Sequence, residues 1–217
     1  MRRGMSRRAF DIEKNSLMRI DLEISDHDYD EREWEIVRRV IHATADFDFT
    51  TTARIIMHKD AIDSAFNAIK SKCTIVADVD MVLSGLNKRS LLGLGLRAVC
   101  HVSDSEVIEL SSRLNKTRSE MAMRYAANEM NEGIVVIGNA PTALFEAINM
   151  IREQATKPAL VIGVPVGFVS ARESKEELSR AEIPFITNKG RKGGSSVASS
   201  IMNALMLLFT KHRKPST

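Results

Sequence analysis

The sequence predicts a three-layer α/β/α protein, in which a mostly parallel sheet of about five strands lies between helices. Short apolar runs alternate with stretches of helical apolar periodicity from about residue 73 onward. The clearest run, Ile134-Val135-Val136-Ile137, is entirely β-branched, which is typical of a strand buried on both faces. No linker rich in Gly, Pro or Ser divides the chain, so we expect one domain over residues 11–210.

The composition fits one compact domain and disfavours several classes of protein. The chain has 217 residues, of which 44% are hydrophobic, and its net charge of +3 does not require a nucleic-acid partner. The basic excess is local, in segments 1–10, 189–192 and 211–217, of which we expect the first to be a disordered tail and the last a basic tail. No run approaches the roughly 18 apolar residues of a membrane span. Cys73 and Cys100 lack metal-site or disulfide-framework spacing, so we expect a cytoplasmic protein.

The first third of the chain predicts helices. Residues 11–24 alternate apolar and charged side chains, and either a strand or a helix is compatible with this pattern. Residues 28–45 form a clearer helix, because Trp34, Val37 and Ile41 share a helical face and acidic residues crowd the first turn. A turn over 47–52 and a short amphipathic helix over 61–69 should follow.

The remainder repeats a strand followed by a helix. We expect strands at 73–77, 96–102, 134–138, 159–163 and 183–187. We expect helices at about 81–86, in the region up to 128, and at 143–151, 172–180 and 195–210. Strands alternating with helices favour a parallel sheet covered on both faces.

The segment Gly138–Leu144 predicts a ligand-binding loop. A glycine ends the strand, and Asn139 and Pro141 provide the chemistry of a helix start. The backbone N–H groups of this helix start should therefore lie at the carboxyl edge of the sheet, where open α/β sheets bind ligands.

His42 is the residue with the clearest potential for acid–base chemistry. It lies three residues after Arg39 near the end of the first well-defined helix, so both side chains project from one face. Imidazole exchanges protons near neutral pH. A histidine held by the helix dipole is the simpler structural explanation, and the residues alone favour it. No histidine or carboxylate pair has zinc-site spacing, so we expect no metal ligands.

Two basic corners could bind anions. Thr117 and Glu120 match a capping box, and Arg118 places a cation at the positive end of that helix, which suits a bound anion and solvent exposure equally well. Residues 188–196 combine Lys189, Arg191 and a further lysine with three glycines before the last helix. We favour an anion site there, although the spacing matches neither a Walker A sequence nor a dinucleotide fingerprint.

The segment Gly163–Val169, at the exit of another predicted strand, is largely apolar. Its glycines and its proline fix the backbone, while its apolar side chains present a wall rather than a polar cradle. A fourth exit runs from Asp78 to Asn87, where Gly85 and Asn87 should end the helix that follows the strand. An apolar wall, several anion-binding corners and one histidine suit a large, flat polycarboxylate better than a nucleotide.

Several segments together resemble one enzyme family. They are Val40–Thr44, Thr117–Ser119, Gly138–Leu144, Gly163–Val169, Glu173–Glu176 and Gly190–Ser195. In family order, over about residues 9–209, they resemble precorrin-8X methylmutase and its anaerobic counterpart, cobalt-precorrin-8 methylmutase. The N-terminal tail is longer and more basic than the family needs. Asp80 stands where the family leads us to expect a small or amide residue.

The resemblance implies an isomerase of cobalamin biosynthesis. Such an enzyme moves a methyl group from C-11 to C-12 of a corrinoid tetrapyrrole, metal-free or carrying cobalt, and gives hydrogenobyrinate or cobyrinate. The shift is intramolecular, so no cofactor is expected, and the family forms homodimers. His42 would be the proton donor and acceptor. The implied substrate-binding residues are Ser16, Arg39, Gly85, Asn87, Arg118, Asn139, Thr142, Gly163, Val166, Gly167, Lys189 and Arg191.

Three other functions remain open on the sequence. A corrinoid-binding protein without catalytic activity would have the same pocket. The basic, glycine-rich loop is also compatible with a nucleotide- or phosphate-binding α/β enzyme. Nucleic-acid binding through the basic tails is the least favoured, and we expect neither a nucleic-acid nor a membrane partner.

Overall fold

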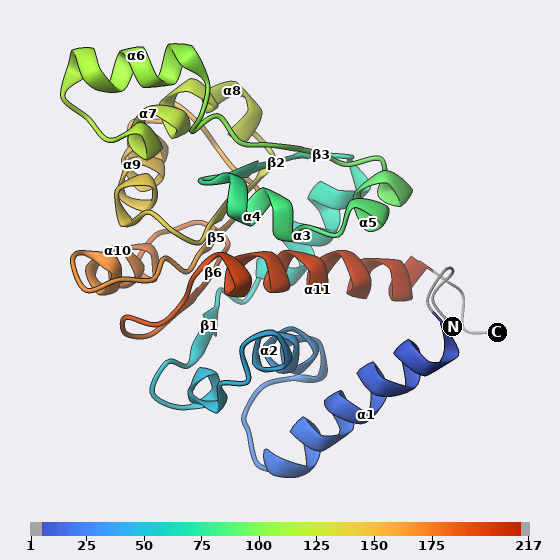
Figure 1. The fold of residues 1–217 in the computed structure, drawn as a ribbon. Coiled ribbons are helices and arrows are strands. Elements are labelled where there is room, and N and C mark those ends of the chain that lie inside the picture. The colour runs from blue at the N-terminus through green and yellow to red at the C-terminus, as the bar shows by residue number, and fades with distance from the viewer. Residues whose placement is uncertain (1–5, 214–217) are drawn as a thin grey trace.

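A computed structural model describes residues 6–213 and contains one six-stranded sheet (Figure 1). The strand order is β1-β6-β5-β4-β2-β3, and all neighbours are parallel except β1 and β6. The strands are β1 (Ile55–Met57), β2 (Thr74–Ala77), β3 (Arg97–Val99), β4 (Ile134–Ile137), β5 (Leu160–Gly163) and β6 (Phe185–Asn188). The α/β fold and the five expected strands are confirmed.

The edge strand β1 was not predicted from the sequence. It consists of three residues, only the first of which is buried, and so lacks the continuous apolar run of the other strands. It pairs with β6 in antiparallel register, Ile55 opposite Asn188. The expected turn before it contains a 3-10 helix, η1 (Phe47–Thr50). The connection from α2 (Glu31–Thr44) through η1 to β1 therefore places the end of α2 beside the chain that leaves β6.

Alternate strand residues divide the core into two layers. Ile134 and Val136 of β4 pack in the layer that contains helices α2, α3 (Ala61–Lys70), α4 (Asp80–Gly85) and α11 (Ser195–Arg213). Val135 and Ile137 pack against α7 (Arg118–Tyr125), α8 (Ala127–Met130), α9 (Pro141–Arg152) and α10 (Ala171–Leu178) on the other face. Period-two alternation with both faces buried explains why these strands are apolar throughout.

The first segment is helix α1 (Arg7–Glu23), which resolves the choice between strand and helix. Ser6 caps it by accepting a hydrogen bond from the backbone N–H of Ala9, and Leu17 and Ile20 are its buried residues. It packs on α2 rather than on the sheet, as Figure 1 shows. The expected tail over residues 1–10 therefore includes the first turn of a helix, and residues 1–5 lie outside the described residues.

Two further boundaries differ from expectation. Gly85 ends α4, as expected, whereas Asn87, expected to end the same helix, caps a new helix, α5 (Lys88–Leu94). The helical region after β3 begins with α6 (Ser105–Leu114). The last helix continues to Arg213, so residues 211–213 belong to it, and the rest of the expected C-terminal tail lies outside the described residues. Within the described part of the chain, no helix combines the length and apolar character of a membrane span.

Candidate active site

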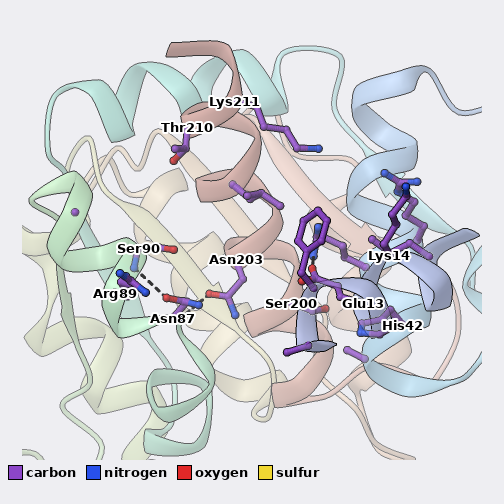
Figure 2. Close-up of a pocket in the computed structure, with 18 of the residues that line it drawn as sticks. Glu13, Lys14, His42, Asn87, Arg89, Ser90, Ser200, Asn203, Thr210 and Lys211 are labelled. Carbon is purple, nitrogen blue, oxygen red and sulfur yellow. Dashed lines mark hydrogen bonds and ion pairs between the residues drawn. The ribbon is translucent and has the colours of Figure 1, made fainter. Parts of the chain in front are cut away.

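A large cavity lies between α1, α2, α5 and α11, and His42 is part of its wall (Figure 2). Its volume is about 1380 Å³. Pockets for drug-sized ligands commonly measure about 300–1,000 Å³, so this one has room for a macrocycle. Figure 2 shows His42 and Lys14 on one side and Asn87 and Arg89 on the other, with α11 between them.

His42 projects from the last turn of α2 and is exposed to solvent. The helix ends at Thr44, and the next residue, Ala45, takes the left-handed conformation with φ 52° while its N–H donates to the carbonyl of Ile41. The two residues before His42, Val40 and Ile41, are fully buried on the core side of the helix. A buried stripe therefore fixes the rotation of α2 and turns the imidazole toward the cavity, where a proton-exchanging group can reach a ligand.

Arg39 and Ser16 occupy different environments. The Arg39 guanidinium lies in the cavity wall and forms an ion pair with Glu13 of α1, with Nη1 and Oε1 3.0 Å apart. Ser16 donates a hydrogen bond from Oγ to the carbonyl of Ile12, one turn earlier in its own helix, and it is not part of the cavity wall. Only Arg39 of this pair therefore faces the expected ligand directly.

The cavity is strongly basic. Among residues 6–213, five cationic side chains apart from His42 line it, together with a single carboxylate. They are Lys14, Arg38, Arg39, Arg89 and Lys211, and the carboxylate is Glu13. Lys14 and Arg89 are exposed at opposite walls, so their charges can reach substituents at the rim of a bound molecule. A surface of this sign attracts a polycarboxylate.

Asn87 and Gly85 hold the wall of the cavity together. Asn203 of α11 bridges them, because its Oδ1 accepts from the Asn87 backbone N–H at 2.8 Å and its Nδ2 donates to the Gly85 carbonyl at 2.9 Å. A Cβ atom at Gly85 would lie 2.5 Å from Oγ of Ser199. Gly85 therefore allows α4 to approach α11 closely, whereas Asn87 both caps α5 and faces the cavity.

The loop after β4 uses its backbone N–H groups internally. The carboxylate of Asp78, at the end of β2, accepts hydrogen bonds from the N–H groups of Gly138, Asn139 and Ala140 at 3.1, 2.8 and 2.8 Å. Burial raises the pKa of Asp78, and the three N–H donors oppose that rise. Pro141 is the first residue of α9, as expected, but Asn139 does not cap the helix. The expected free anion cradle is thus filled by a protein carboxylate.

Arg118, Asn139 and Thr142 come together beside this loop. Thr117 caps α7 in the expected capping box, and its Oγ1 lies 3.0 Å from Oγ1 of Thr142 at the start of α9. Arg118 and Asn139 are exposed, and Arg118 forms no ion pair within residues 6–213. A cation at the positive end of a helix with no carboxylate partner suits an anionic ligand.

The loops after β5 and β6 lie side by side at the same edge. The Gly167 N–H donates to the Arg191 carbonyl at 3.1 Å, and the Arg191 guanidinium lies 5.8 Å from the ring centre of Phe168. Val166 is exposed, as the expectation of an apolar wall requires. Gly193 has φ 149°, and a Cβ there would lie 2.2 Å from the Val164 carbonyl oxygen, so only glycine permits this contact between the loops.

Gly163 and Lys189 belong to other surroundings. Gly163 is buried in β5, where the side chains of Leu144 and Leu178 fill the space that its own Cβ would need. Lys189 lines a second cavity of about 410 Å³ together with the buried Lys175. Gly163 thus serves packing, and Lys189 points away from the cavity that contains His42.

The structure therefore divides the expected residues into two groups. His42, Arg39 and Asn87 line the large cavity, while Arg118, Asn139, Thr142, Val166, Gly167 and Arg191 gather at the carboxyl edge of the sheet. Arg89, Asn203 and Lys211 also line the cavity, although none of them was predicted to do so from the sequence. Asn203 had a usable signal, because it is the polar residue that interrupts the apolar stretch 201–209 of α11. Arg89 and Lys211 resemble ordinary surface charges, and only the fold brings them to the cavity.

Comparison with known proteins agrees with this architecture. The family model of precorrin-8X methylmutase matches residues 11–208. Cobalt-precorrin-8 methylmutase of Leptospira interrogans is 50% identical over 208 residues, which cover 92% of this chain and 94% of that protein. The protein of the same name from Priestia megaterium is 48% identical over 197 residues, covering 91% and 87% of the two chains.

The fold is also that of a solved relative. The crystal structure of precorrin-8X methyl mutase from Thermus thermophilus superposes with a TM-score of 0.84 at 36% identity, over 93% of this chain and 98% of that one. Methylmutases are isomerases, and the family match spans nearly the whole described chain. The chain therefore belongs to the precorrin-8X methylmutase family and is an isomerase.

Proposed function

We propose that this isomerase moves a methyl group from C-11 to C-12 of precorrin-8 or cobalt-precorrin-8, with His42 as the proton donor and acceptor. The observation that carries the proposal is the position of His42 in the wall of a basic cavity of about 1380 Å³. The names of the related proteins support the corrinoid substrate. The products are hydrogenobyrinate or cobyrinate, and any cobalt arrives as part of the substrate.

The chemistry requires little beyond proton transfer and orientation. The methyl group stays within one molecule, so neither a methyl donor nor a redox cofactor enters the reaction. A proton added to or removed from the macrocycle changes which isomer is more stable. General acid–base catalysis of this kind is worth about 10²–10⁴-fold in rate.

The cationic residues supply binding and orientation. Lys14, Arg39 and Arg89 line the cavity from α1, α2 and α5, so they can hold carboxylates on different sides of a flat ring. A bidentate guanidinium fixes both the position and the plane of a carboxylate. The ring would thereby be held with one edge against His42.

The decisive experiment removes the imidazole. His42→Ala is expected to keep binding of the coloured corrinoid, measured by its absorbance, and to lose about 10²-fold or more in kcat. His58→Ala is the matched control, because His58 contacts Asp60 and Phe185 away from the cavity. Wild-type turnover in His42→Ala would overturn the role of the histidine. Tight binding without turnover in the wild-type protein would instead support a non-catalytic corrinoid-binding protein.

A homodimer is the second part of the proposal. Arg118 and Asn139 do not line the cavity that contains His42, so a second copy that covers the cavity with its carboxyl-edge loops would unite both groups of residues. Exposed Met18 and Leu22 on α1, and Phe168 in the loop after β5, offer apolar area for such a contact. Light scattering after size exclusion measures the mass; a monomer at assay concentration would refute this arrangement.

The nucleotide alternative receives less support. A phosphate at the start of α9 would need the N–H groups that Asp78 already binds. We therefore expect hydrogenobyrinic acid to raise the melting temperature and ATP or NAD to leave it unchanged. The opposite pattern would favour a nucleotide enzyme.

A further inference from the structure

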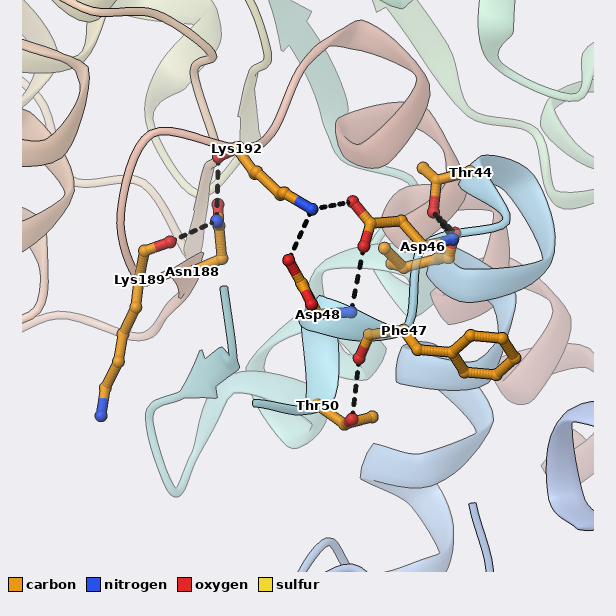
Figure 3. Close-up of polar contacts among 9 residues, drawn as sticks. Thr44, Asp46, Phe47, Asp48, Thr50, Asn188, Lys189 and Lys192 are labelled. Atoms are coloured by element: carbon orange, nitrogen blue, oxygen red, sulfur yellow. Dashed lines mark hydrogen bonds and ion pairs between the residues drawn. The ribbon is translucent and has the colours of Figure 1, made fainter. Parts of the chain in front are cut away.

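The ammonium group of Lys192 joins two segments that are distant in sequence. In the loop after β6, its Nζ lies 2.6 Å from Oδ2 of Asp46 and 2.7 Å from Oδ2 of Asp48 (Figure 3). Both carboxylates belong to the connection that follows α2. The side chain of Lys189, in the same loop, extends away from this cluster in Figure 3.

The two aspartates are tied directly to the end of the helix that carries His42. The Thr44 hydroxyl bonds to the Val40 carbonyl and accepts the backbone N–H of Asp46 at 3.3 Å. Asp46 in turn accepts the N–H of Asp48 at 3.0 Å and so caps η1. A short run of hydrogen bonds thus connects the last turn of α2 to both carboxylates.

The backbone of Lys192 is anchored in the core. The carbonyl of Lys192 accepts from Nζ of Lys175 at 2.6 Å and from Nδ2 of Asn188 at 2.9 Å. Lys175 is 2% exposed and Asn188 is 1% exposed. The backbone of Lys192 is therefore held by two buried side chains, while its ammonium group holds the residues that follow His42.

This arrangement separates Lys192 from its cationic neighbours. Asp46 and Asp48 raise the pKa of Lys192, and Lys192 lowers the pKa of Asp48, so the charged forms of both are favoured together. A cation already bound by two carboxylates contributes little to the capture of an anionic ligand. Arg191, one residue earlier, has no carboxylate partner among the described residues and remains available for that role.

We propose that Lys192 is a positioning residue for the methylmutase reaction, which fixes the end of α2 and thereby the imidazole of His42 through Asp46 and Asp48. The inference rests on the proposed role of His42. It assigns the basic loop after β6 two tasks, ligand attraction and alignment of the helix that carries the reactive group.

The test separates positioning from substrate binding by a split between kcat and KM. Lys192→Met should lower kcat about 10- to 100-fold, since a displacement of about 1 Å at a reacting group costs this much, with KM changed less than about threefold. Lys192→Arg keeps the cation and should restore most of kcat. Arg32→Met is the matched control, because Arg32 forms a surface ion pair with Asp63 at the opposite end of α2.

A double variant of the two aspartates tests whether they are the partners through which Lys192 acts. Asp46→Asn with Asp48→Asn keeps oxygen acceptors for the bonds that cap η1 but removes both charges. In this background Lys192→Met should cause no further loss of kcat, because the interaction is already broken. The imidazole signals of His42 in NMR spectra should shift in Lys192→Met and stay unchanged in Arg32→Met.

Each result has a distinct meaning. A raised KM with unchanged kcat in Lys192→Met would show that Lys192 binds the substrate directly and would overturn the inference. Wild-type kinetics would overturn it as well. Turnover retained in His42→Ala would refute the proposed function instead. If Lys192→Met does not fold, Asp48→Asn gives the same test from the other side, with a smaller expected loss of kcat.

Discussion

Replacement of Asp78 tests whether a buried carboxylate organises the loop after β4. Asp78 is fully buried and accepts three backbone hydrogen bonds from residues 138–140. Asp78→Ala removes all three acceptors, whereas Asp78→Asn keeps the shape and one oxygen. Asp80→Ala is the control, since Asp80 is exposed and accepts a side-chain hydrogen bond from Ser103 at 2.9 Å rather than the backbone hydrogen bonds of the loop after β4.

The three hydrogen bonds to Asp78 determine how much the free energy of unfolding should fall. Each buried N–H left without an acceptor costs about 1–3 kcal/mol, so three give about 3–9 kcal/mol before relaxation. The alanine variant no longer buries a carboxyl group, and the upward effect of burial on the pKa of Asp78 shows that this burial is unfavourable. Water can also enter the vacated space. We therefore expect a loss near the low end, about 3–4 kcal/mol, for Asp78→Ala.

The asparagine variant should lose less. Oδ2 of Asp78 accepts from both Asn139 and Ala140, and an amide oxygen at this position keeps those two bonds. The amide nitrogen then faces the N–H of Gly138, which loses its acceptor, so the expected cost is about 1–3 kcal/mol. Asp80→Ala should change stability by less than about 0.5 kcal/mol.

Urea unfolding measures these differences as shifts in the midpoint at constant m-value. The order of stability should be wild type, Asp78→Asn and then Asp78→Ala. A loss below about 1 kcal/mol for the alanine variant, or a greater loss for asparagine than for alanine, would refute the reasoning, because either result means that the N–H groups find other acceptors.

Three further predictions concern charged groups. Arg118→Ala should raise KM more than it lowers kcat, measured by steady-state kinetics, if the exposed guanidinium binds a substrate carboxylate throughout the reaction; an unchanged KM would leave Arg118 a solvated residue. Partial burial lowers the pKa of His101, but hydrogen bonds to Asp104 and Glu129 raise it overall. Its stabilisation is present below pH 6.5 and lost as pH rises through the folded pKa, so His101→Gln should cost about 2 kcal/mol in urea unfolding at pH 6 and progressively less in alkali. Burial lowers the pKa of Lys175 from 10.5 to about 8, so wild-type stability should rise by up to about 3 kcal/mol between these pH values, and Lys175→Met should abolish that rise.

The parts of the fold that were predictable are those with strong local signals. All four residues of β4 are buried, so its sequence shows an unbroken apolar run. The strand β1 has one buried residue in three, and its pairing with Asn188 and its neighbours depends on residues far away in sequence. Asn87 was misjudged for a local reason, since an asparagine two residues after a glycine can end one helix or begin the next.

The candidate site was predictable in its residue types but only partly in its geometry. His42 was identified with the aid of the family resemblance, because the residues alone favoured a structural histidine at a helix end. Asp78 was recognised as a strand exit, yet only the fold shows that it accepts the N–H groups expected to bind a ligand. The contact between Lys192 and Asp46 spans 146 positions, and no local pattern encodes it.

These misjudgements share a physical origin. Helix starts, glycines and cations at a sheet edge indicate where anions can bind, but a protein carboxylate satisfies the same donors as well as a ligand does. Asp78 and the pair Asp46 and Asp48 are such internal anions. Asp78 binds backbone N–H groups, and Asp46 and Asp48 bind a lysine, that we had expected to bind the substrate. We therefore expect the cations without a carboxylate partner among residues 6–213, such as Arg118 and Arg191, to indicate the substrate surface better than the motifs themselves do. Charge that remains uncompensated in the folded chain is the more specific signal for an anionic ligand.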